Sequence, residues 1–199
     1  MSRIVVMNHV TLDGVMQAPG RPEEDTRDGF ADGGWANRSQ PADEAVGKAM
    51  GERMAAGGGL AGWLFGRRTY EDLLGYWNQQ PDSQFGPMLN NSPKSVVSST
   101  LTAPLPWPNS TLVQGEVTDA VVALKAQSAG VVGIMGSGEL IGGLMAGGLI
   151  DEYLLMIHPL VLGTGRRLFP EAVHSSLRLT DSVSTTTGIV IATYETGTD

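Results

Sequence analysis

The stretch VVGIMGSGELIGG (131–143) joins an apolar run to a cluster of glycines. The apolar run is typical of a parallel strand buried on both faces, and the residues after it have the pattern of a helix. Gly136 and Gly138 let backbone N–H groups approach an anion, and the helix that begins near Glu139 points its positive end at the same place. The spacing departs by one position from the dinucleotide fingerprint G-x-G-x-x-G. The stretch alone therefore fits both a phosphate-binding turn and an ordinary strand-to-helix turn.

Outward from this stretch, strand-like and helix-like segments alternate. Apolar runs predict further parallel strands at 4–12, 60–65 and 95–98. Helical spacing of apolar residues predicts helices over 41–56, 69–77, 118–127 and 138–147. This order is typical of an α/β domain with a mostly parallel sheet and helices on both faces.

The last third of the chain has a different pattern. The strand-like run 152–162, the alternating segment 177–183 and the β-branched and aromatic segment 189–194 predict an antiparallel end on the parallel sheet. The segments 13–40, 78–93 and 98–110 are rich in loop-forming residues, and we predict loops there. We expect a single domain over 1–199.

The composition excludes several classes of protein. The 199 residues, 41% of them hydrophobic, suit one well-packed domain. The net charge of −8 disfavours nucleic acids and anionic membranes as partners, since both attract basic surfaces. Cysteine is absent, which excludes disulfides and thiolate metal sites. The N-terminus lacks a secretory signal pattern, and the apolar run 140–150 is shorter than a membrane span. We therefore expect a cytoplasmic protein that binds neither nucleic acid nor membrane.

Two other groups of residues have open interpretations. His9, His158 and His174 are scattered without metal-like spacing, so we expect core or surface roles and no metal site. Arg166 and Arg167 follow a glycine-rich turn, and they fit either a ligand contact or a solvated hairpin edge.

A second glycine turn occurs in WLFGRRTYEDL (63–73). Gly66 permits a turn after the predicted strand, and Thr69 can cap the helix that follows. Arg67 and Arg68 can supply charge-assisted hydrogen bonds to a phosphate at this helix start. Taken alone, the two arginines are more typical of a solvated pair after an ordinary cap.

Two more turn-like stretches follow predicted strands: VVSSTL (96–101), which carries hydroxyls, and TLDGVMQAPG (11–20), with a turn at Asp13 and Gly14. Each alone fits an ordinary turn. In an open α/β sheet, however, the carboxyl ends of parallel strands meet at one edge, where ligands bind. One extended ligand with phosphate groups would contact all four stretches.

This combination resembles the dihydrofolate reductase superfold. More closely, it resembles the reductase domain of the bifunctional riboflavin-biosynthesis deaminase-reductase and its stand-alone bacterial relatives. The resemblance runs along nearly the whole chain and is carried by TLDGVMQAPG (11–20), FGRRTYE (65–71), VVSSTL (96–101), MGSGELIGGLMAGGLIDEY (135–153) and HPLVLGTGRRLF (158–169).

The resemblance implies a dihydrofolate reductase-like three-layer fold, a homodimer, and NADPH lying across the strand ends. It implies four groups of cofactor-binding residues, which contact the phosphates nearest adenosine, the 2′-phosphate and adenine, the pyrophosphate, and the nicotinamide. In that order they are Gly66, Arg67, Arg68 and Thr69; Ser98 and Ser99; Gly136, Ser137, Gly138, Glu139 and Leu140; and Leu12, Gly14 and Val15.

The expected activity is hydride transfer from NADPH to a C=N or C=O carbon of a small heterocyclic molecule of pterin, pyrimidine or flavin-precursor type. The proton would come from water, Asp13 or Asp43, which falls at the edge of the apolar stripe of 41–56. Asp43 alone is more typical of a first-turn acid that complements the helix dipole. The segment 13–40, with Trp35 as a possible lid residue, would close over the site. The alternatives are a non-catalytic NADP-binding module and a genuine dihydrofolate reductase.

Overall fold

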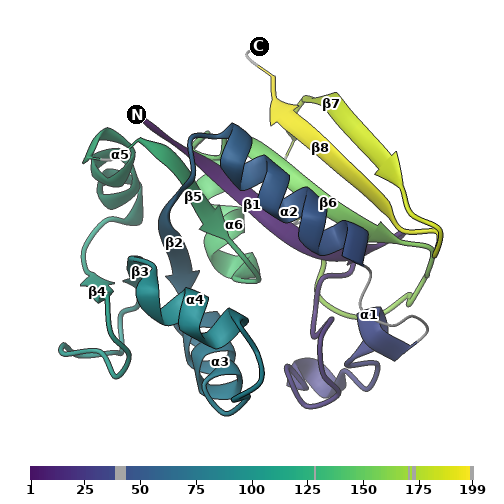
Figure 1. Cartoon of the computed structure of the whole chain (residues 1–199), viewed down its shortest axis with the longest axis horizontal. Helices are drawn as coiled ribbons and strands as arrows, with labels where there is room; N and C mark the ends of the chain where they lie inside the picture. Colours follow the sequence, from purple (N-terminus) through teal and green to yellow (C-terminus); the bar gives the residue numbers. More distant parts are fainter. Residues whose placement is uncertain (39–43, 128, 170, 172–173, 198–199) are drawn as a thin grey trace.

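The computed structural model describes residues 1–38, 44–127, 129–169, 171 and 174–197. Within them, one sheet of eight strands has the order β4-β3-β2-β5-β1-β6-β8-β7 (Figure 1). The strands are β1 (Ser2–Thr11), β2 (Leu60–Gly66), β3 (Lys94–Val97), β4 (Ser110–Val113), β5 (Gly130–Ile134), β6 (Glu152–His158), β7 (Leu177–Ser184) and β8 (Val190–Thr196).

Neighbouring strands in the part of the sheet with the order β4-β3-β2-β5-β1-β6 pair in parallel. In contrast, β8 pairs antiparallel with both β6 and β7. The structure thus confirms the mostly parallel sheet with an antiparallel C-terminal edge. β6 ends at His158, short of the predicted 162, because the next residue is a proline, which has no N–H to donate to the ladder.

Helices cover both faces of the sheet (Figure 1). The helical elements are η1 (Arg27–Gly29), α1 (Trp35–Arg38), α2 (Glu44–Ala56), α3 (Arg67–Trp77), α4 (Phe85–Asn91), α5 (Val117–Gln127) and α6 (Gly138–Ala146). Successive side chains of β1 point to opposite faces. Ile4 and Val6 pack in the core shared with α5 and α6, and Val5 and Met7 pack in the core shared with α2, α3 and α4.

Two predicted loops contain regular structure. The segment 78–93 includes α4, and the irregular piece 98–110 leads into β4, which extends the parallel edge by one strand. Both elements are short, and short apolar segments carry little periodicity. No helix among the described residues is long and apolar enough to cross a membrane.

The long segment after β1 has a small core of its own. Val15, Ala18, Phe30 and Trp35 are buried together, and Trp35 donates a hydrogen bond from Nε1 to the Gln17 carbonyl at 2.7 Å. Trp35 is only 3% exposed, so in this structure it is a packed core residue.

Candidate functional site

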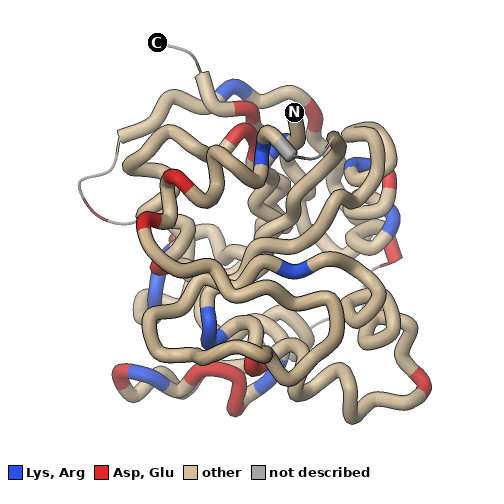
Figure 2. The backbone as a smooth tube through the Cα atoms, turned by 90° about the vertical axis from the view of Figure 1, so that its left-hand side faces the viewer, with Lys and Arg blue, Asp and Glu red and all other residues tan. Residues whose placement is uncertain are grey.

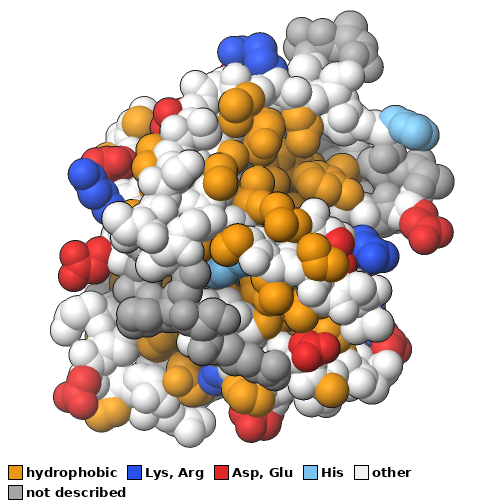
Figure 3. Space-filling model, turned by 90° about the vertical axis from the view of Figure 1, so that its right-hand side faces the viewer, with side chains coloured by type: hydrophobic (Ala, Val, Ile, Leu, Met, Phe, Trp, Pro, Cys, Tyr) orange, Lys and Arg blue, Asp and Glu red, His pale blue; other side chains and the backbone are white. Residues whose placement is uncertain are grey.

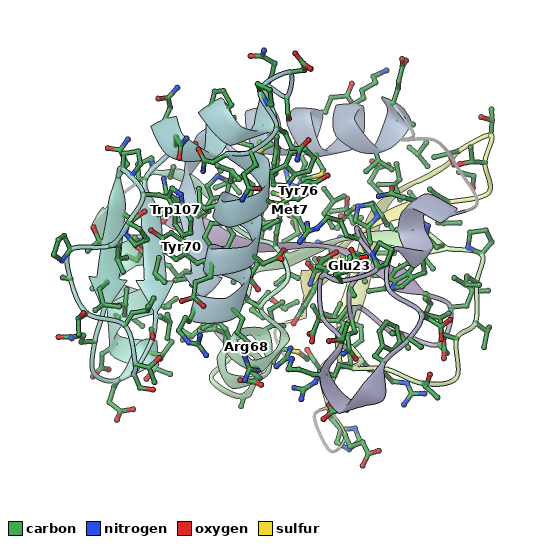
Figure 4. All side chains as sticks on the ribbon, turned by 90° about the horizontal axis from the view of Figure 1, so that it is seen from below. Met7, Glu23, Arg68, Tyr70, Tyr76 and Trp107 are labelled. Atoms are coloured by element: carbon green, nitrogen blue, oxygen red, sulfur yellow. The ribbon has the colours of Figure 1, made fainter. Side chains whose placement is uncertain are left out.

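A large open cavity lies at the edge where the parallel strands end. Its walls are the ends of β1, β2, β3 and β5, the first turns of α3 and α6, and the segment from Met16 to Arg27. Figure 4 looks at this edge from below: Arg68, Met7 and Tyr76 all line the cavity, and Glu23 belongs to the facing segment. Charged residues of both signs gather along this lower edge (Figure 2).

The two glycine turns open on the same rim and are hydrogen-bonded to each other. The Gly66 N–H donates to Ser137 Oγ at 3.0 Å, and the Ser137 N–H donates to Thr69 Oγ1 at 2.9 Å. The prediction that Thr69 caps its own helix is therefore wrong. The helix α3 begins at Arg67, and its N-cap is Gly66. Its hydroxyl instead joins α3 to the turn before α6.

The backbone around Gly136 explains the glycine at that position. Gly136 has φ 59°, and a Cβ there would lie 2.9 Å from Thr69 Cγ2. Its N–H donates to Asn8 Oδ1 at 2.7 Å, and the Asn8 side chain is buried. Ser137 is also left-handed, with φ 58° and ψ 42°. The amides of Gly136 and Ser137 are thus used within the protein, and amides available to an anion must come from the helix starts.

Both helix starts face the cavity. The first residues of α3 and of α6 line it, and neither helix has a side-chain hydrogen bond at its N-cap. Uncapped N–H groups and the helix dipole attract anions. Gly66 and Gly138 keep the approach to these amides free of side chains.

Three arginines converge on one carboxylate oxygen at the mouth of the cavity. Glu139 Oε1 lies 3.4 Å from Arg27, 3.5 Å from Arg68 and 3.2 Å from Arg166. Arg67 instead pairs with Glu71 one turn later on α3, at 2.9 Å. Because the Glu139 side chain is 76% exposed, these ion pairs contribute little to stability, and a bound anion can replace the carboxylate.

The serines after β3 also line the cavity. Ser98 Oγ accepts hydrogen bonds from the N–H groups of Thr100 at 3.1 Å and Leu101 at 3.0 Å, which fixes the turn. Ser99 is exposed. Leu140, in the first turn of α6, completes the set of predicted phosphate-side residues that the structure brings together.

The predicted nicotinamide residues lie apart from this set. Leu12, Gly14 and Val15 are not among the cavity-lining residues, which enter this segment at Met16 and Gln17. Leu12 is 65% exposed and Val15 is fully buried.

Asp13 is placed for a structural role. Its carboxylate accepts hydrogen bonds from Thr11 Oγ1 at 2.6 Å and from the N–H groups of Gly163 at 2.8 Å and Leu162 at 3.2 Å. The Thr11 hydroxyl, followed by these backbone donors, lowers the pKa of Asp13 to about 2. Such a carboxylate stays ionised near neutral pH, so it is poorly suited to donate a proton. The other predicted acid, Asp43, lies outside the described residues.

Sequence reasoning missed one titratable group at the cavity, Glu24, and expected only a core or surface role for a second, His9. Glu24 lines the cavity, and burial raises the pKa of this carboxyl group. His9 lines it as well, and His9 Nδ1 lies 2.8 Å from Nε2 of the buried His158. The histidines are 149 positions apart, so only the pairing of β1 with β6 brings them together. No group of three metal-binding side chains occurs in the part of the chain that the structure describes.

The overall fold is shared with several solved structures. A Shewanella sp. PV-4 protein named after riboflavin biosynthesis superimposes with a TM-score of 0.72 at 22% identity, covering 98% of this chain and 99% of that one. A pyrimidine reductase-like protein from Corynebacterium diphtheriae superimposes with a TM-score of 0.66 at 12% identity, covering 100% of this chain and 93% of that one. Dihydrofolate reductase from Enterococcus faecalis, complexed with NADP(H), superimposes with a TM-score of 0.61 at 12% identity, covering 98% of this chain and 97% of that one. The dihydrofolate reductase-like fold expected from the sequence is confirmed.

Sequence comparison gives the same grouping. The uncharacterized protein YyaP of Bacillus subtilis is 28% identical over 138 residues, which are 66% of this chain and 71% of YyaP. The family model of the RibD C-terminal domain matches residues 3–191. The chain therefore belongs to the RibD C-terminal domain family.

Proposed function

We propose that the protein is an NADPH-dependent reductase that transfers hydride to a C=N or C=O carbon of a small heterocyclic substrate. Membership of the RibD C-terminal domain family supports a reductase-type function. The observation that carries the proposal is the hydrogen-bonded rim, where Ser137 and Thr69 hold two uncapped helix starts side by side. Two such anion-attracting ends at one edge suit a ligand with two separated phosphate groups.

The residues at this rim fit the cofactor. The first-turn amides of α6, from Gly138 to Leu140, would hold the pyrophosphate. Arg27 and Arg166 lie nearby, and each keeps a second carboxylate partner, Asp25 and Asp28 respectively, besides Glu139. Arg67 and Arg68 would contact the phosphates nearest adenosine, the 2′-phosphate included, with Gly66 and Thr69 shaping the turn. Ser98 and Ser99 would lie beside the 2′-phosphate and adenine. When bound, the reduced nicotinamide would supply the hydride.

The protein contributes position and a proton. The strand ends and the packed segment after β1 form the walls against which a bound cofactor and substrate would be positioned. Glu24 is the cavity acid whose raised pKa suits it to carry a proton, in addition to water and the sequence candidate Asp43.

Titration of NADPH and NADH tests the cofactor assignment. A charge-assisted hydrogen bond contributes roughly 1.5–3 kcal/mol, so Arg67→Ala or Arg68→Ala should weaken NADPH binding by about 10- to 100-fold and NADH binding much less. Arg178→Ala is the matched control, because Arg178 lies on β7 and pairs with Glu195 away from the cavity. Equal affinities for both nucleotides in all four proteins would reject the assignment.

The structural hydrogen bonds of the Asp13 carboxylate remove one candidate proton donor, which favours a second candidate, a module that binds NADP(H) without turnover. Oxidation of bound NADPH in the presence of pterins, pyrimidines and flavin precursors separates the two functions. Turnover of dihydrofolate in the same assay would identify a dihydrofolate reductase.

We also propose that a second copy of the chain covers β7. This strand is the sheet edge, and all its residues after Leu177 are exposed, among them Leu179 and Val183. Figure 3 shows apolar side chains gathered on the face at this end of the sheet. Light scattering should give a dimer for wild type and a monomer for Leu179→Asp. The control Val122→Asp, at an exposed position on α5, should remain dimeric.

A further inference from the structure

The cavity has an apolar end beyond the glycine turns. Its walls come from β1, α2, the α3–α4 pair and β6, and their side chains belong to one apolar cluster. The residues are Met7, Val46, Met50, Trp77, Phe85 and Met156. Methionine and aromatic side chains pack well against the faces of flat rings.

This end has little free charge. The Tyr76 ring packs on the Trp77 ring of this end, with centroids 5.1 Å apart, and the Arg21 guanidinium sits 4.0 Å from the centroid of the Tyr76 ring. Arg21 is also ion-paired with Asp72, so its charge is neutralised. The Glu24 carboxylate accepts hydrogen bonds from the N–H groups of Gly20 at 2.7 Å and Arg21 at 3.0 Å. An anionic ligand would therefore lose its hydration here without gaining Arg21 as a free cation.

One imidazole introduces hydrogen-bonding capacity among these apolar walls. His9 lines the cavity next to Met7 on β1, and its Nδ1 is bonded to His158 Nε2. The His158 ring is held in turn by the edge of Trp35, with the ring centroids 5.2 Å apart. The described residues give His9 Nε2 no hydrogen-bond partner. Burial, followed by the charge of His158, lowers the pKa of His9 to about 4, so this ring is neutral near pH 7.

The pair of histidines has a consequence for a ligand. If His158 donates its Nε2 proton to His9, then His9 Nε2 carries a proton and is a donor towards the cavity. If His9 donates from Nδ1, then His9 Nε2 is an acceptor. The tautomer of His158 and the kind of hydrogen bond that His9 offers are therefore coupled.

We propose that the apolar end of the cavity binds a flat, uncharged heteroaromatic ring, and that His9 forms the hydrogen bond to the edge of this ring in a tautomer set by His158. The inference rests on the proposed function and narrows its substrate class to molecules without a phosphate or carboxylate at this end. His9 is the ligand contact, and His158 is a positioning residue.

Pterin and pterin-6-carboxylate are suitable probes, because they share one fluorescent ring system and differ by one negative charge. Affinities are measured by fluorescence titration of protein saturated with NADP⁺, after NADP⁺ binding itself has been measured. Pterin should bind at least about ten-fold more tightly than its carboxylate, which corresponds to about 1.4 kcal/mol. His9→Phe should weaken pterin binding by about five- to twenty-fold, and His9→Asn should retain part of the affinity.

His174→Phe is the matched control, because His174 is exposed and outside the cavity lining. The three histidines of the chain also allow a readout without turnover. In ¹⁵N spectra of the rings, pterin should shift the His9 Nε2 signal, and His158→Gln should change the His9 tautomer.

The outcomes separate this inference from the proposed function. Failure of NADP⁺ to bind rejects the proposed function, and this inference with it. If NADP⁺ binds, the inference alone is overturned when pterin does not bind, when the carboxylate binds as tightly as pterin, or when His9→Phe leaves pterin affinity unchanged.

Discussion

The hydrogen bond between the two cavity turns can be tested at Ser137 with a pair of substitutions. Ser137 Oγ accepts the Gly66 N–H at 3.0 Å, and the residue itself is left-handed, with φ 58°. Ser137→Ala removes the acceptor and keeps the unfavourable backbone. Ser137→Gly also removes the acceptor, but glycine adopts this backbone without steric cost.

The magnitudes follow from these two terms. Loss of the hydrogen bond should cost about 0.5–1.5 kcal/mol. The left-handed conformation costs a non-glycine residue about 1–2 kcal/mol, and the glycine variant avoids this cost. The greater conformational freedom of glycine in the unfolded chain takes back about 0.5–1 kcal/mol of that gain. The alanine variant should therefore be about 1 kcal/mol less stable than wild type, and the glycine variant should fall between the two.

Urea unfolding, with the midpoint and m-value fitted together, measures these differences. For a chain of this length, 1 kcal/mol corresponds to a shift in Tm of about 2–4 °C. Equal stability of the two variants would show that the backbone at this position is not strained. Wild-type stability of Ser137→Ala would show that the bond between the turns contributes nothing.

Three further predictions concern buried ionisable groups. Glu152 is fully buried and ion-paired with Arg53, so Glu152→Gln should lower the free energy of unfolding by about 3–5 kcal/mol. Glu195 belongs to a more exposed ion pair, and Glu195→Gln should lower it by less than about 1 kcal/mol. Urea unfolding measures both changes. Burial lowers the pKa of Lys94 below 10.5 in the folded protein, so the unfolded chain binds more protons in the pH range just below 10.5. The free energy of unfolding should therefore rise as the pH rises towards 10.5. Lys94→Met should abolish this slope in unfolding curves recorded across that range. Burial lowers the pKa of His9 from 6.5 to about 4. The stability that the neutral His9 ring contributes should therefore be complete above pH 6.5 and be lost as the pH falls towards 4. A His9→Phe variant whose thermal unfolding kept the wild-type pH dependence would contradict this.

Much of the sheet could be predicted from the sequence, because a parallel strand buried on both faces is a continuous apolar run wherever it sits in the fold. The runs that became β1, β2, β3 and β5 were of this kind. The short elements α4 and β4 were not predicted, since each is stabilised mainly by its neighbours: α4 packs on α3, and β4 pairs with β3.

The candidate site could be predicted in part. Gly66 and Gly136 were identified from their places after strands, and the structure joins their turns on one rim. The structural role of Asp13 could not be predicted, because the backbone donors at Leu162 and Gly163 that hold its carboxylate are far away in the sequence. The meeting of Arg27, Arg68 and Arg166 at Glu139 is hidden for the same reason.

The sequence by itself determined what is local: strand and helix positions, the glycine turns at strand ends, and the acidic, cysteine-free composition. Tertiary structure alone decided which distant side chains meet, among them His9 with His158 and Ser137 with Gly66. The physical reason is that apolar periodicity and turn chemistry depend on neighbouring residues. A hydrogen bond or ion pair between distant segments depends instead on strand order and register, which are properties of the whole sheet.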